Sequence, residues 1–126
     1  MTPARAIFVF TADNDLLIFT GLDEASSWME AVDVDDGEYP AIYTDEGSVV
    51  KASLNSETVV LADSGRRDLD DLSNRLARYA EMVDLPAPTD RLAFANTMLK
   101  REWDRQRSRR PRWLFKRIYG ETPPFV

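Results

Sequence analysis

Acidic side chains gather on one short stretch of the chain, and they are the residues best placed to bind or to react. This stretch, residues 33–54, contains one base, Lys51, and its acids are Asp33, Asp35, Asp36, Glu38, Asp45 and Glu46. Two aromatic side chains, Tyr39 and Tyr43, stand between the two acidic groups. Carboxylates at this density could bind a divalent cation, serve as a general acid and base, or complement a basic partner.

The spacing gives little support to cation binding or catalysis. An EF-hand loop needs an acid five residues before its glycine and Glu six residues after it, whereas Gly37 has Val32 and Tyr43 there. A cation site improvised from the acids of this turn stays an alternative. The chain has no histidine, no cysteine, no glycine-rich phosphate loop, no serine elbow and no His-Glu-x-x-His pattern. We therefore expect a protein that is not an enzyme and has no catalytic residue, metal or cofactor.

Basic residues concentrate at the other end of the chain. Residues 1–65 carry 13 acids and 2 bases, whereas residues 100–126 carry 3 acids and 9 bases. Arg101, Arg105 and Arg109 recur every fourth residue, as on the outer side of a helix, and aromatic residues such as Trp103 stand among the bases. This pattern suits contact with nucleic-acid phosphates, a helix at a membrane surface, or a packed helix with a solvated outer side. The net charge of −6 opposes nucleic-acid binding.

Turns and strands alternate around the acidic residues. Acidic glycine turns at 35–37 and 45–47 precede strands at 38–43 and 48–54, where β-branched and aromatic residues suit a pleated surface. Further strands are expected at 5–10, 16–19 and 58–62. A helix starts after Thr20, and its apolar spacing places five residues inward: Leu22, Ala25, Trp28, Met29 and Val32. Pro40 cannot donate to a ladder, so its strand is an edge or pairs on one side there.

The second half of the chain changes to a helical period. Apolar spacing predicts helices from residue 68 to about 84, from 89 or 90 to 110, and from 111 to 119. The resulting order, β-β-α-β-β-β-α-α-α, predicts one α+β domain over residues 1–126, with 1–65 mainly sheet and 66–126 helical. We expect an antiparallel sheet of about five strands with its helices on one face. The absence of a long apolar run or a signal peptide favours a cytoplasmic protein without membrane contact. The sequence leaves the oligomeric state open.

One part of the chain resembles a known class of protein. Residues 33–39 (DVDDGEY), after a helix with Trp28 and Met29 and before residues 41–47 (AIYTDEG), are similar to small bacterial immunity proteins of polymorphic toxin systems. The resemblance covers about residues 16–50. It implies a cytoplasmic, non-catalytic protein that binds a basic toxin domain, with the six acids, Tyr39 and Tyr43 as partner-binding residues. Nucleic-acid binding through Arg101, Arg105 and Arg109 is the alternative.

Overall fold

The computed structural model describes residues 5–109 and 125–126. Its antiparallel strands are β1 (Ile7–Phe10), β2 (Leu16–Phe19), β3 (Ala41–Thr44), β4 (Ser48–Asn55) and β5 (Thr58–Arg67). Its helices are α1 (Leu22–Trp28), α2 (Ala31–Asp35), α3 (Leu69–Met82) and α4 (Arg91–Arg109). The α+β class and the five-stranded antiparallel sheet predicted from the sequence are confirmed. The helix expected at 111–119 lies outside the described residues.

The sheet has the order β2-β1-β3-β4-β5, with β1 pairing β2 on one side and β3 on the other. Every residue of β1 is buried, because its run of four apolar residues leaves no polar side to face water. This strand therefore needs cover on both faces of the sheet.

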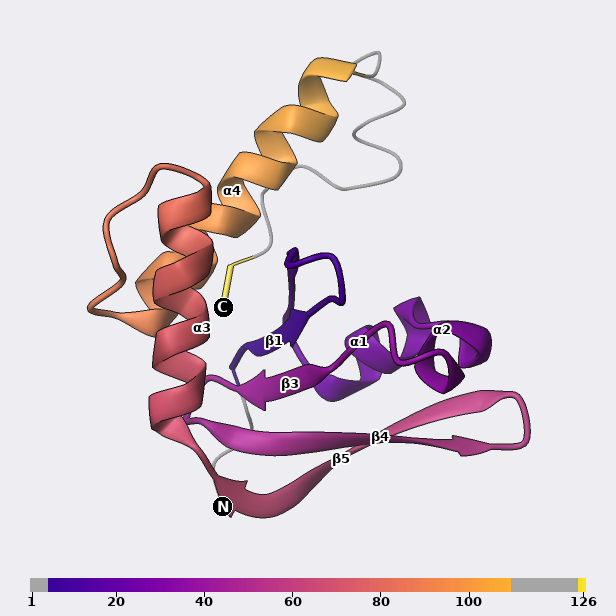
Figure 1. Cartoon of the computed structure of the whole chain (residues 1–126). Helices are drawn as coiled ribbons and strands as arrows, with labels where there is room; N and C mark the ends of the chain where they lie inside the picture. The colour runs from indigo at the N-terminus through magenta and orange to yellow at the C-terminus, as the bar shows by residue number, and fades with distance from the viewer. Residues whose placement is uncertain (1–4, 110–124) are drawn as a thin grey trace.

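The helices provide that cover, and they lie on both faces of the sheet rather than on the single face expected. Phe8 and Phe10 point into a core completed by α3 and α4, whereas Ile7 and Val9 point into a second core completed by α1 and β5. Figure 1 shows α3 and α4 together at one side of the sheet, away from α1 and α2. Side chains alternate along a strand, so two apolar sets on β1 demand two layers of cover.

The helix expected at 22–32 is interrupted. Met29 and Glu30 both adopt extended backbone conformations, which end α1 at Trp28 and begin α2 at Ala31. Met29 is buried at this break, whereas Trp28 and Val32 are 54% and 58% exposed. The prediction that Trp28 and Val32 face the core is therefore wrong. Val32 follows the break, in α2, and Trp28 stands at the end of α1, where Ala25 and Met29 occupy the buried positions.

The strand expected at 38–43 is shorter and starts later. Asp33 and Asp35 belong to α2, and Gly37, with φ of +74°, ends that helical segment before β3 begins at Ala41. Pro40 lies just before β3, which is not an edge strand but stands between β1 and β4. β3 joins β4 at a single residue pair, Tyr43 with Val49. The long ribbon of β4 and β5 separates from β3 beyond that pair, as Figure 1 shows.

Candidate functional site

The segment formed by α1, α2 and the turn after them carries an uninterrupted negative charge. Residues 23–38 contain seven acids and no base. Five of these acids are exposed and two are half-buried; they are Asp23, Glu24, Glu30, Asp33, Asp35, Asp36 and Glu38. We call these residues, with Trp28, Val32 and Tyr39, the acidic surface. Asp35 and Asp36 lie at the end of α2, where nothing in the described chain neutralises them.

Trp28 is the aromatic side chain that the sequence reading missed on this surface. Its ring centroid lies 5.7 Å from that of the buried Phe19 and 6.4 Å from that of the half-buried Tyr39, while 54% of Trp28 stays exposed. Val32 extends the exposed apolar area on α2.

Tyr39 joins the acids on this surface. Burial is the largest cause that raises the pKa of Tyr39, and the charges of Asp33, Glu38 and Glu30 raise it further. The carboxylates of Asp33, Glu38 and Glu30 therefore all lie near the Tyr39 hydroxyl, although they come from different parts of the segment.

The second acidic turn does not join this surface. Glu38 precedes β3 and Glu46 follows it, so the strand separates the two groups of acids. Glu46 is exposed, and its carbonyl oxygen accepts two hydrogen bonds from the Arg67 guanidinium, at 3.2 and 2.8 Å. The eight residues proposed from the sequence as one partner-binding set are therefore divided.

Asp45 and Tyr43 are buried, which corrects their assignment to a partner-binding surface. The Asp45 carboxylate accepts hydrogen bonds from the backbone N–H groups of Arg5 and Ala6, at 2.9 and 3.1 Å. Its carbonyl oxygen accepts one from Arg91 Nε at 2.6 Å. Tyr43 donates its hydroxyl proton to Asp71 on α3. Asp45 therefore connects the turn after β3 to residues 5–6 and to α4, and Tyr43 connects β3 to α3.

The alternative site, on α4, is present as a row of exposed arginines. Arg101, Arg105 and Arg109 are all exposed, and Trp103 on the same helix is buried, as expected. Arg105 forms an ion pair with Glu102 at 2.6 Å. A second ion pair joins Lys100 to Asp104 at 2.8 Å. Part of the positive charge on this helix is therefore balanced within the helix itself.

No protein-family model, curated protein or solved structure matches the chain. Among the described residues, no three acidic side chains gather in an arrangement that could hold a metal ion. None of the helices in that part of the chain has the length and apolar character needed to cross a membrane. The geometry of the acidic surface is therefore the observation on which a functional proposal rests.

Proposed function

We propose that this chain is a non-catalytic, cytoplasmic binding protein of the immunity type, which neutralises a basic toxin domain through the acidic surface. The observation that carries the proposal is the exposure of Trp28 inside a segment with seven acids and no base. The resemblance of residues 33–39 to such proteins supports it, and these residues form α2 and the turn that follows.

The arrangement fits what is known of the energetics of protein interfaces. A few large side chains, most often Trp, Tyr and Arg, contribute most of the binding energy, and charged groups around them add specificity and speed of association. The Trp28 ring already rests between Phe19 and Tyr39, so it loses little conformational freedom when a partner covers it. The surrounding acids would attract a basic partner and repel acidic ones.

A protection assay tests the proposal. The genes that flank the coding sequence are searched for one that encodes a basic toxin domain, and the chain is expressed in bacteria together with that domain while growth is measured. Binding of the two purified proteins is followed by surface plasmon resonance. We expect Trp28→Ala to abolish protection and to increase the dissociation rate, because hot-spot truncations typically cost about 2 kcal/mol or more. Asp35→Lys should mainly slow association and weaken its dependence on salt.

Glu81→Lys provides the matched control, because it reverses an equally exposed charge on α3, outside the acidic surface. It should leave protection and association unchanged. If Trp28→Ala and Asp35→Lys bind as tightly and as fast as the unmodified chain while all variants remain folded, the acidic surface is only solvated and the proposal fails.

One observation keeps nucleic-acid binding as a second candidate: the three arginines of α4 form an exposed row. A gel-shift series with duplex DNA and RNA at increasing salt decides it, since phosphate contacts lose affinity steeply as salt rises. Arg101→Gln combined with Arg109→Gln should remove the shift. Absence of any shift at low salt excludes this candidate.

A further inference from the structure

A cleft opens where β3 and β4 separate. The two strands share only the pair Tyr43 with Val49, and the space beyond that pair has a volume of about 590 Å³. Its walls come from β3, β4, the end of β5 and α3. A volume of this size is typical of sites for small molecules, and it lies apart from the acids of residues 23–30.

A β-bulge in β5 places Arg66 in the wall of the cleft. Ser48 pairs with Arg67 and Val50 pairs with Asp63, so β5 has two more residues than β4 in this interval. Gly65 takes a φ of +78° in the bulge. The freed N–H groups are satisfied locally, because Gly65 N–H donates to Asp63 Oδ1 at 2.9 Å and Arg66 N–H donates to Ser64 Oγ at 3.2 Å. Bulges of this kind redirect side chains, here that of Arg66.

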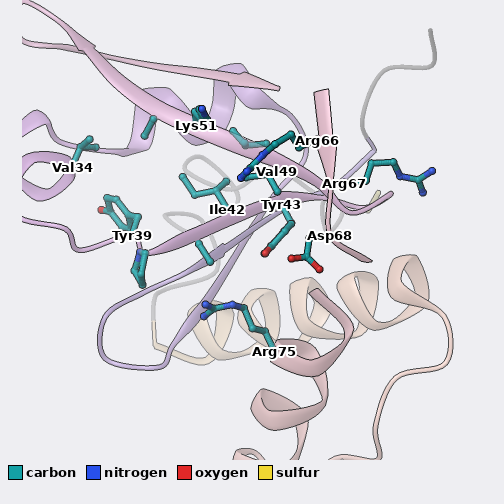
Figure 2. Close-up of a pocket in the computed structure, with 14 residues that line it drawn as sticks. Val34, Tyr39, Ile42, Tyr43, Val49, Lys51, Arg66, Arg67, Asp68 and Arg75 are labelled. Atoms are coloured by element: carbon teal, nitrogen blue, oxygen red, sulfur yellow. The ribbon is translucent and has the colours of Figure 1, made fainter. Parts of the chain in front are cut away.

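The charged residues that line the cleft are predominantly basic. The lining contains four cationic side chains and one carboxylate, namely Lys51, Arg66, Arg67, Arg75 and Asp68. Figure 2 shows the Arg66 guanidinium turned toward Val49 and Ile42, whereas that of Arg67 points away. Arg67 is bonded to the Glu46 carbonyl, and Arg75 is bonded to Asp71 at 2.9 Å. Within the ranges that the structure describes, Lys51 and Arg66 form no ion pair.

The carboxylates near the cleft already have partners. Asp68 accepts a hydrogen bond from the N–H of Asp71 at 3.1 Å as the N-cap of α3, and Asp71 is bonded to Tyr43 and Arg75. At the opposite end the charges of Asp33 and Glu38 raise the pKa of Tyr39, so negative charge adjoins that end. Positive charge without a carboxylate partner is therefore concentrated at the Arg66 end, in a chain whose net charge is −6.

We propose that the cleft between β3 and β4 binds a small phosphate-bearing molecule, with its phosphate at Arg66 and Lys51. These two cations come from neighbouring strands and form no ion pair among the described residues. The phosphate oxygens accept hydrogen bonds in the forked geometry that a guanidinium group provides. A carboxylate offers fewer oxygens to such an arrangement. The Tyr39 ring at the far end limits the length of the ligand.

Calorimetric titration of the whole chain with inorganic pyrophosphate tests the proposal, with citrate as the carboxylate comparison. We expect saturable binding of pyrophosphate with a dissociation constant of about 1 mM or tighter, which a few charge-assisted hydrogen bonds support. Arg66→Gln should weaken this binding about 10-fold or more. Arg107→Gln removes the same charge from the exposed surface of α4 and should leave it unchanged.

Three results would overturn the proposal. Binding of pyrophosphate that never saturates would show that the cleft has no site. An equal loss in Arg66→Gln and Arg107→Gln would show a general effect of charge. Citrate that binds more tightly than pyrophosphate would show that phosphate is not the preferred group. Circular dichroism of each variant establishes that it is folded before binding is compared.

Discussion

The hydroxyl of Tyr43 connects the sheet to α3 through a small network. Burial first, and then its hydrogen bond to Asp71, raise the pKa of Tyr43 to about 12. The same bond, followed by the bond from Arg75, lowers the pKa of Asp71. The Arg75 guanidinium also lies 5.7 Å from the centre of the Phe10 ring. The network therefore stabilises the protonated tyrosine and the ionised aspartate together.

Stability should consequently fall in alkaline solution. In the unfolded chain Tyr43 loses its proton near its ordinary pKa of 10, whereas in the folded chain it keeps the proton to about pH 12. Raising the pH through this interval therefore favours unfolding, by about 2–3 kcal/mol from this residue alone. Tyr43→Phe should be about 1–3 kcal/mol less stable at neutral pH, through loss of the hydrogen bond, and should lose less stability above pH 10. Urea unfolding across this range measures both effects; parallel curves for the two proteins would contradict the prediction.

At the scale of helices and strands, the sequence predicted the elements that a local residue pattern marks. The positive φ of Gly47 forms the turn after β3, and the helical period from Leu69 onward gives α3, so both were placed correctly. The extended conformation at Met29 and Glu30 has no such signal, because no proline or glycine marks the break. Val32 follows that break in α2 and is exposed. Its exposure could not be predicted from an apolar spacing that continues through the break.

The bulge of β5 offers a test at the scale of an element. Gly65→Ala adds a Cβ that meets nothing within 4 Å, so its effect is backbone strain at positive φ, about 1–2 kcal/mol. If the bulge relaxes, Arg66 moves and pyrophosphate binding should weaken in a calorimetric titration. Gly37→Ala is the matched control, because Gly37 has a φ of +74° and equally free space but stands far along the chain from the bulge. It should reduce stability similarly without weakening binding. If Gly65→Ala and Gly37→Ala bind pyrophosphate equally well, the bulge does not contribute to the binding site.

The whole molecule has two cores that meet at β1. One lies between the sheet and the pair α3 and α4, and the other lies between the sheet, α1 and the ribbon of β4 and β5. Alternation along β1 predicts two cores once the strand is known to be central. The continuous apolar run of this strand indicates that it is central, but the sequence could not show which strands flank it, because the pairing of β1 with β3 joins residues more than 30 positions apart. The division of the acids follows from the course of β3 between Glu38 and Asp45.

A gradient of local stability should follow from this organisation. Residues of β1 are covered on both faces, whereas Leu54 and Val60 near the tip of the ribbon are each 41% exposed. Amide hydrogen exchange under native conditions should therefore be slowest in β1 and much faster in residues 54–60, since local opening exposes little apolar area there. Uniform protection of the sheet would contradict this expectation.

The two additional residues of β5 have a consequence for how such a chain can change by insertion and deletion. Side chains of a strand alternate with a period of two, so an insertion of two residues leaves every other side chain on its original face. Val59 and Leu61 before the bulge and Arg67 after it therefore keep their orientations with or without it. During evolution, a single insertion or deletion of two residues could therefore add or remove Arg66 without changing how the ribbon of β4 and β5 packs.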